Sequence, residues 1–292
     1  MSSVNISRLC IIGVGLIGGS LARALRSANA VNEIIGCGRD AEHLSKAKAL
    51  GVIDRYTTDL TEGVADAEMV VLAVPLGAMQ NILATIAPAL TSECIITDVG
   101  SAKSSVVNAA RQVFKERAPR FVPGHPIAGT EKSGVEAAFA ELFQNRRVIL
   151  TPTEASDALA VEKVRDMWEV CGAEVVEMGV THHDEILAAT SHLPHMLAYA
   201  LVDTLARMDD SREIFDFAAG GFRDFTRIAS SDPDMWHDIC LANHDALVKV
   251  LEAFSDDLRM LADAVRRADS KFLKDTFTRA KQARDAFCDD GE

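Results

Sequence analysis

His125 is the first residue whose type and setting suit chemistry. It lies in the segment Phe121–Glu131, where two prolines and two glycines predict an irregular loop directly after a strand. A neutral imidazole at such a point can accept a proton from a substrate hydroxyl while hydride leaves the same carbon, because the pKa of histidine lies near neutrality. The segment equally allows a histidine that is only hydrogen-bonded within a rigid loop.

A second group of histidines occupies residues 182–195. His192 and His195 are three residues apart and would share one face of a helix, so a zinc site is one interpretation. We favour the wall of a substrate site and no metal, because neither an H-E-x-x-H motif nor a nearby cysteine accompanies them. Pro194 would also perturb an ordinary helix. Helix-start polarity for His182–Asp184 and interface packing for His192 remain alternatives.

The third group is Arg223 and Arg227, which lie among aromatic side chains in the segment 218–228, with Trp236 nearby. In a chain whose formal net charge is −13, arginines in such a setting favour a binding role over a solvated face. A guanidinium can hold a carboxylate through two parallel hydrogen bonds. A structural ion pair with a neighbouring aspartate is the alternative.

Near the N-terminus, Gly13, Gly15 and Gly18 have the spacing G-x-G-x-x-G. The apolar run before them predicts a strand, and the apolar positions after them recur at helical spacing. The first glycine allows a tight turn, the second lets the backbone approach a pyrophosphate, and the third lets the helix pack closely on the strand. This structural context predicts a dinucleotide site.

Strands and helices alternate through the first 180 residues. Predicted strands cover 9–12, 33–38, 69–75, 94–98, 120–122, 148–151 and 174–177, and predicted helices cover 41–50, 79–90, 104–117 and 158–171. The pattern predicts an α/β fold with a Rossmann-type doubly wound parallel sheet, whose ligands bind beyond the carboxyl ends of the strands. The segments expected at that edge are 13–18, 38–40, 74–76, 98–101 and 124–126.

From about residue 181 the pattern is helical only. Long helices are predicted for 235–267 and 270–287, and segment 218–228 reads as a glycine-broken loop or short helix. We therefore expect a dinucleotide-binding domain over residues 1–180 and an all-α domain over residues 181–292. So few long helices cannot easily bury all their apolar faces alone, so we expect them to pair with a second subunit in a homodimer.

Charge and cysteine usage bound the class of protein. The net charge of −13 argues against a nucleic acid or an anionic membrane surface as partner, since both require a basic face. The six cysteines are widely spaced without a C-x-x-C motif, which is typical of reduced thiols in a cytoplasmic protein. We expect no signal peptide, because residues 1–8 lack a basic start and a long apolar region. We expect no membrane span, because no apolar run reaches about 18 residues.

Several of these stretches together resemble the prephenate/arogenate dehydrogenase family of tyrosine biosynthesis. The matching segments are 13–20 (GVGLIGGS), 98–103 (DVGSAK), 124–131 (GHPIAGTE), 182–184 (HHD), 191–195 (SHLPH) and 221–229 (GFRDFTRIA). The resemblance implies an oxidative decarboxylation of prephenate or arogenate, in which hydride passes to NAD(P)⁺ and carbon dioxide leaves as the ring becomes aromatic. It also implies a dimer formed through the helical domain.

The resemblance assigns roles by matching positions. His125 would accept a hydrogen bond from the substrate 4-hydroxyl with Ser101 assisting, Arg227 would bind a substrate carboxylate, and His195 would line the same pocket. We group Arg223 with the substrate-binding residues. The family uses four further matching positions to shape or gate the site: Glu131, His183, Asp184 and Trp236.

The expected cofactor contacts are Gly13, Gly15, Leu16, Ile17 and Gly18 in the glycine loop, with Val74 and Pro75 at the end of the third predicted strand. The slot where NAD-specific members carry an acidic residue holds Gly38, and Arg39 follows it. We therefore expect NADP, with Arg39 meeting the 2′-phosphate, although Asp40 keeps NAD open.

Two other classes fit part of this pattern. A β-hydroxyacid dehydrogenase or an imine reductase shares the plan of a dinucleotide domain followed by a helical dimer domain. A non-catalytic dinucleotide sensor would explain the glycine loop and leave the histidines and arginines without a role.

Overall fold

The computed structural model describes residues 5–115, 120–130 and 132–289, without the side chains of residues 287 and 289. The chain divides into two compact units, Met1–His244 and Asp245–Glu292. None of the helices in the described ranges is long and apolar enough to cross a membrane.

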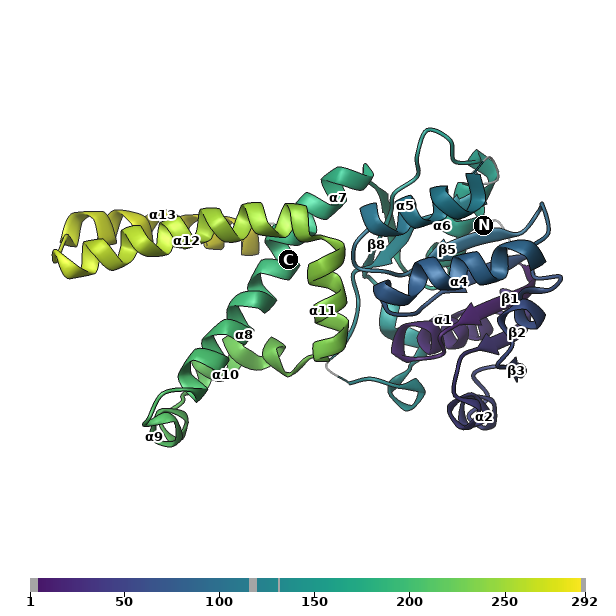
Figure 1. The fold of residues 1–292 in the computed structure, drawn as a ribbon, viewed down its shortest axis with the longest axis horizontal. Coiled ribbons are helices and arrows are strands. Elements are labelled where there is room, and N and C mark those ends of the chain that lie inside the picture. Colours follow the sequence, from purple (N-terminus) through teal and green to yellow (C-terminus); the bar gives the residue numbers. More distant parts are fainter. Residues whose placement is uncertain (1–4, 116–119, 131, 290–292) are drawn as a thin grey trace. The chain divides into compact units, whose positions relative to one another are not determined.

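The first unit is built on a six-stranded parallel sheet with the order β3-β2-β1-β4-β5-β6 (Figure 1). Its strands are β1 (Ile6–Ile12), β2 (Val31–Cys37), β3 (Arg55–Thr57), β4 (Met69–Leu72), β5 (Ile95–Asp98) and β6 (Phe121–Val122). The order reverses between β1 and β4, so the helices that follow these two strands lie on opposite faces of the sheet, and dinucleotides bind at this point of such an architecture. The predicted Rossmann-type sheet is confirmed.

Each face of this sheet carries its own hydrophobic core. Leu9 and Ile11 point to one core with α1 (Leu16–Ser27), α2 (Ala41–Ala49) and α6 (Ala158–Val170). Cys10 and Ile12 point to the other core with α3 (Leu60–Val64), α4 (Met79–Ile86) and α5 (Ser104–Phe114). Because helices cover both faces, β4 and the Leu9–Ile12 part of β1 are apolar at every position.

The strands predicted at 148–151 and 174–177 do not join this sheet, which corrects the expectation of a single one. They form β8 (Arg147–Leu150) and β9 (Glu174–Glu177) of a three-stranded sheet with β7 (Gly124–Pro126). His125 therefore lies on a strand, opposite Ile149 in an antiparallel pair, and not in an irregular loop. Pro123 lacks the amide hydrogen that would continue the parallel ladder, so β6 ends before it and the chain pairs anew.

The remaining helices of this unit follow β9: α7 (Val180–Leu187), η6 (Ala188–His192), α8 (Leu193–Ala206), α9 (Ser211–Asp216), α10 (Gly220–Thr226), η7 (Arg227–Ser230) and α11 (Pro233–Ala242). The turn η6 is a π-helix between α7 and α8. Pro194 lies in the first turn of α8 and has no amide hydrogen to donate, so the widened turn accommodates it.

The second unit contains α13 (Ser270–Asp289) and all of α12 (His244–Arg266) except its first residue. The single helix predicted for 235–267 is wrong, because α11 ends at Ala242 and α12 begins at His244. Asn243 interrupts the pattern, with its side-chain amide donating to the carbonyl oxygen of Asp184 at 2.8 Å. A contact between distant segments thus ends a helix that apolar periodicity alone would continue.

Candidate active site

The glycine loop after β1 fits a dinucleotide. Gly13 has a φ of +96°, and a Cβ there would lie 2.2 Å from the carbonyl oxygen of Ala73, so the loops after β1 and β4 touch. A Cβ on Gly18 would lie 2.3 Å from the carbonyl oxygen of Gly13. At Gly15 no atom lies within 4 Å of the Cβ position, so a ligand can approach the backbone there.

The neighbours of that loop support the same role. Leu16 and Ile17 form the first turn of α1, which has no side-chain cap and so leaves its first amide hydrogens for phosphate oxygens. Val74 and Pro75 leave β4 at the same edge of the sheet. The predicted cofactor segments therefore meet where the strand order reverses.

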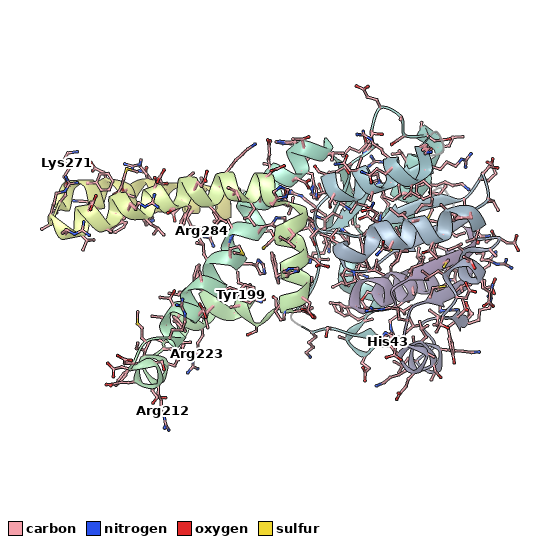
Figure 2. All side chains as sticks on the ribbon, viewed as in Figure 1. His43, Tyr199, Arg212, Arg223, Lys271 and Arg284 are labelled. Carbon is pink, nitrogen blue, oxygen red and sulfur yellow. The ribbon has the colours of Figure 1, made fainter. Side chains whose placement is uncertain are left out.

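The segment after β2 combines a cation with a helix cap. Arg39 is exposed, and among the described residues it has no hydrogen-bond or ion-pair partner. Asp40 caps α2 by accepting from the amides of Glu42 and His43. Nε2 of His43 (labelled in Figure 2) lies 2.8 Å from the carbonyl oxygen of Val14, and this contact attaches α2 to the glycine loop.

A buried ion pair joins Asp98, the last residue of β5, to Lys103 in the loop that follows, and both side chains are fully excluded from solvent. Asp98 also accepts from the amides of Gly100 at 2.8 Å and Gly124 at 3.2 Å. Nζ of Lys103 donates to the carbonyl oxygen of Gly124 at 2.7 Å. Burial lowers the pKa of Lys103, and the Asp98 carboxylate opposes that shift. The pair fixes the start of β7, directly before His125.

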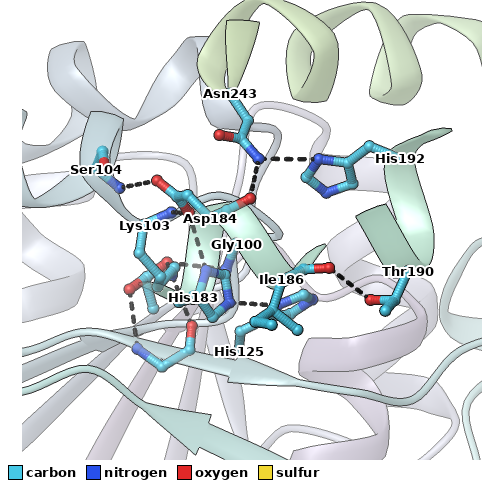
Figure 3. A network of polar contacts seen from close by, with 12 residues as sticks. Gly100, Lys103, Ser104, His125, His183, Asp184, Ile186, Thr190, His192 and Asn243 are labelled. Carbon is cyan, nitrogen blue, oxygen red and sulfur yellow. Dashed lines mark hydrogen bonds and ion pairs between the residues drawn. The ribbon is translucent and has the colours of Figure 1, made fainter. Parts of the chain in front are cut away.

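His125 begins a chain of buried hydrogen bonds (Figure 3). Nδ1 of His125 lies 2.9 Å from Nε2 of His183, and Nδ1 of His183 lies 2.9 Å from Oδ1 of Asp184. The Asp184 carboxylate further accepts from the amides of Lys103 at 2.7 Å and Ser104 at 2.8 Å, at the start of α5. The partners come from β7, α7 and α5, and they meet at one point.

Burial and these hydrogen bonds set the charge states. Desolvation lowers the pKa of His125 well below its usual value and also lowers the pKa of His183, so both rings are neutral near pH 7. Burial alone would raise the pKa of Asp184, but the hydrogen bonds from His183 and Ser104 outweigh it and lower that pKa to about 2. The cluster is thus a carboxylate followed by two neutral imidazoles.

A second ring cluster continues from the π turn. The His195 ring stacks on Trp236 with centroids 3.7 Å apart and planes inclined by 21°. The His192 ring contacts the same indole edge-on, with ring centroids 6.0 Å apart. Nδ1 of His192 lies 3.1 Å from Nδ2 of Asn243. Desolvation lowers the pKa of His192 to about 4. Asn243, which also donates to the backbone of Asp184, links the two clusters.

The other predicted site residues lie outside these clusters. Ser101 is half-buried in the loop that leads to Lys103. Arg223 on α10 (labelled in Figure 2) and Arg227 in η7 are exposed. Both elements pack against α8. Glu131 lies outside the described residues. Within the described ranges, no group of three histidine, cysteine, aspartate or glutamate side chains is arranged to hold a metal ion.

Family models match both halves of the chain. Residues 21–177 match the nucleotide-binding domain of prephenate dehydrogenase, and residues 180–279 match its dimerization domain. The chain belongs to the prephenate dehydrogenase family. Among relatives of this family, the chain is 40% identical to cyclohexadienyl dehydrogenase of Zymomonas mobilis, over 94% of both chains. It is 39% identical to prephenate dehydrogenase of Bacillus subtilis, over 95% of this chain and 75% of the relative.

Solved structures of the family agree with the fold. Prephenate dehydrogenase from Aquifex aeolicus, in complex with hydroxyphenyl propionate and NAD⁺, superposes with a TM-score of 0.90 at 37% identity, covering 97% of this chain and 99% of that one. Synechocystis arogenate dehydrogenase superposes with a TM-score of 0.80 at 29% identity, covering 96% and 99%. Family membership sets aside the hydroxyacid dehydrogenase and imine reductase alternatives.

The sequence did not predict the contacts of four residues that hold these clusters together: Asp98, Lys103, His192 and Asn243. His192 was expected in the wall of a substrate site or in interface packing, and Lys103 and Asn243 had no expected role. Lysine is almost never fully buried unless it is paired, and its pairing with Asp98 depends on the fold of the loop. One signal was present, because Asp98 ends a predicted strand at the edge where ligands bind. Asn243 gave no signal, since it lies within a continuous helical pattern.

Proposed function

We propose that this chain catalyses the oxidative decarboxylation of prephenate to 4-hydroxyphenylpyruvate in tyrosine biosynthesis, and that arogenate, which yields tyrosine, is an alternative substrate. The observation that carries the proposal is the buried neutral His125, held by His183 and Asp184 in a chain whose glycine loop fits a dinucleotide. Membership of the prephenate dehydrogenase family supports it. A non-catalytic sensor would not need an imidazole fixed in this way.

The reaction requires a hydrogen-bond acceptor for the substrate hydroxyl more than it requires a strong base. A bound nicotinamide dinucleotide supplies the site that receives hydride from the hydroxyl-bearing ring carbon. The bond from the ring to its carboxylate breaks, carbon dioxide leaves, and the electron pair of that bond completes the aromatic ring. The product is a phenol, so the hydroxyl proton is shared with His125 during the reaction and stays with the product. A neutral imidazole of low pKa suits that task.

We assign the remaining roles as the family resemblance implies. Ser101, at the loop after β5, assists His125 at the hydroxyl oxygen. Arg227 binds a substrate carboxylate with Arg223 beside it, and His195 lines the pocket on the face of Trp236. The cations are needed because the substrate is a dianion and the chain has a net charge of −13.

We infer that NADP⁺ is the preferred cofactor. The position after β2 is Gly38, which has no carboxylate to bind a ribose 2′-hydroxyl, and Asp40 is engaged as the cap of α2. The exposed guanidinium of Arg39 is placed to meet a 2′-phosphate. Replacing Arg39 by alanine should raise the KM for NADP⁺ at least tenfold and leave that for NAD⁺ within about twofold.

We further propose a cytoplasmic homodimer. The description of the second family domain as a dimerization domain supports the dimer. The cysteines Cys10, Cys37, Cys94, Cys171, Cys240 and Cys288 are free, as expected where the medium is reducing.

The deciding experiment follows the absorbance of reduced nicotinamide in four mixtures, each combining prephenate or arogenate with NAD⁺ or NADP⁺. Turnover in any mixture establishes the reaction, and the mixture with the highest kcat/KM identifies substrate and cofactor. If protein that binds the dinucleotide is silent in all four mixtures, the proposed function is wrong and the sensor alternative gains support.

A further inference from the structure

The hydrogen-bond chain from Asp184 to His125 determines which ring nitrogens carry protons. Asp184 is ionised, and an ionised carboxylate can only accept, so Nδ1 of His183 must be the donor in their 2.9 Å contact. A neutral imidazole with a proton on Nδ1 has a lone pair on Nε2. Nε2 of His183 must therefore accept, and Nδ1 of His125, at 2.9 Å, must donate to it.

The proton on Nδ1 of His125 also determines the state of Nε2, on the opposite side of the ring. With its only proton on Nδ1, neutral His125 has a lone pair on Nε2. We propose that His183 and Asp184 are positioning residues that fix this tautomer, so that Nε2 of His125 is the atom that accepts the substrate hydroxyl. The proposal rests on the proposed function, which supplies the hydroxyl.

The contacts of Asp184 fix which groups donate and which accept along this series of hydrogen bonds. Its two carboxylate oxygens accept from two backbone amides at the N-terminus of α5, and its backbone carbonyl accepts from Asn243. Backbone amides cannot reverse their donor role, and the positive end of the helix dipole also favours a carboxylate there. Asp184 is thereby held ionised, with Oδ1 facing His183.

The opposite tautomer of His125 leaves buried groups without partners. With its proton on Nε2, the lone pair of its Nδ1 would face the lone pair of His183 Nε2. If His183 shifted its own proton to restore that contact, its Nδ1 lone pair would face the Asp184 carboxylate. Both arrangements replace a buried hydrogen bond with a repulsive contact, because His183 is fully buried and Asp184 nearly so.

Two substitutions of His183 separate a positioning role from packing. The side-chain oxygen of glutamine can still accept from Nδ1 of His125, whereas leucine fills the space and accepts nothing. We expect His183→Leu to lower kcat about 100-fold with unchanged dinucleotide affinity, and His183→Gln to retain kcat within about tenfold. The matched control is His182→Leu, which removes the exposed neighbour on the same helix and should leave kcat unchanged.

The ring nitrogens themselves give a readout that does not depend on turnover. In ¹⁵N-labelled wild-type protein without substrate, NMR should show His125 protonated on Nδ1 and not on Nε2, with the signals assigned by their loss in His125→Asn. The pattern should persist in His183→Gln and change in His183→Leu. Circular dichroism and dinucleotide affinity establish that each variant is folded.

The outcomes are distinguishable. A proton on Nε2 of His125 in the wild type, or equal kcat for His183→Leu and His182→Leu, overturns the positioning role. The expected NMR pattern in a protein that turns over neither prephenate nor arogenate overturns the proposed function and supports the tautomer assignment alone.

Discussion

Nζ of Lys103 lies 2.7 Å from the carbonyl oxygen of Gly124, although the two residues belong to segments that leave different strands of the main sheet. Lys103 is also paired with Asp98, whose carboxylate accepts from the amide of Gly124. The ion pair therefore binds both the carbonyl oxygen and the amide hydrogen of Gly124, the residue before His125. The six-stranded sheet thus fixes the strand on which His125 lies.

Replacing Lys103 by methionine should destabilise the protein by about 3–5 kcal/mol, because the buried Asp98 carboxylate loses its only charged partner among the described residues. The free energy of unfolding in urea measures this. The control is Lys46→Met, which breaks an exposed pair with Glu136 and should cost less than about 1 kcal/mol. A similar cost for the two variants would contradict the importance of the buried pair.

Replacing His125 by asparagine should lower kcat by about 10²–10⁴-fold, because the amide cannot share the hydroxyl proton as an imidazole does. The affinity for the dinucleotide, measured by fluorescence titration, should be unchanged, since the glycine loop is untouched. If the variant kept the wild-type kcat, His125 would have no role in the reaction.

The main sheet and the glycine loop could be predicted from sequence because their causes are local. Apolar runs such as Met69–Leu72 identify strands buried on both faces, and the steric demands on Gly13 and Gly18 act within a few residues. The second sheet could not be predicted in this way. Its pairing of His125 with Ile149 joins segments 24 residues apart and depends on where β6 stops.

Only part of the candidate site could be predicted from sequence, because its residues come from distant segments. The setting of His125 after a strand singles it out, the family resemblance adds His183 and Asp184, and the structure brings the three together. The order of donors and acceptors along them depends on the tertiary fold, because His125 and His183 are 58 positions apart in the sequence. The carboxylate contacts to the start of α5 likewise come only from the tertiary fold.

Replacing Arg227 by alanine should raise the KM for prephenate about 10–100-fold, because the substrate carboxylate loses a charge-assisted hydrogen bond. Lysine should restore only part of the affinity, since it cannot hold a carboxylate bidentately. Steady-state kinetics at saturating cofactor test this. Arg212→Ala, at an exposed position on α9, is the control and should leave KM unchanged (Figure 2).

Replacing Phe277 by aspartate should convert a homodimer into a monomer. In the second unit, Phe277 is 60% exposed and Val265 is 66% exposed, surfaces that association would remove from water. Light scattering during size-exclusion chromatography gives the mass directly. Leu159→Asp changes a comparably exposed apolar side chain on α6 and should leave the mass as in the wild type. A wild-type protein that is monomeric at micromolar concentration would refute the dimer.

The stability of the protein should fall as the pH falls from about 6.5 to 4, because desolvation holds the pKa of buried His192 at about 4, below its ordinary value of 6.5. In that window the unfolded chain binds the proton that folded His192 does not. Its contribution is therefore complete above pH 6.5 and is lost toward pH 4, and between pH 7.5 and 5 it amounts to about 2 kcal/mol. His125 and His183, whose pKa values burial also lowers, act in the same direction.

Urea unfolding at the two pH values should show a loss about 2 kcal/mol smaller for His192→Gln than for the wild type. His237→Gln, at a side chain that is 68% exposed, should lose as much as the wild type. Equal losses in all three proteins would mean that His192 is protonated as readily in the folded chain as in the unfolded one.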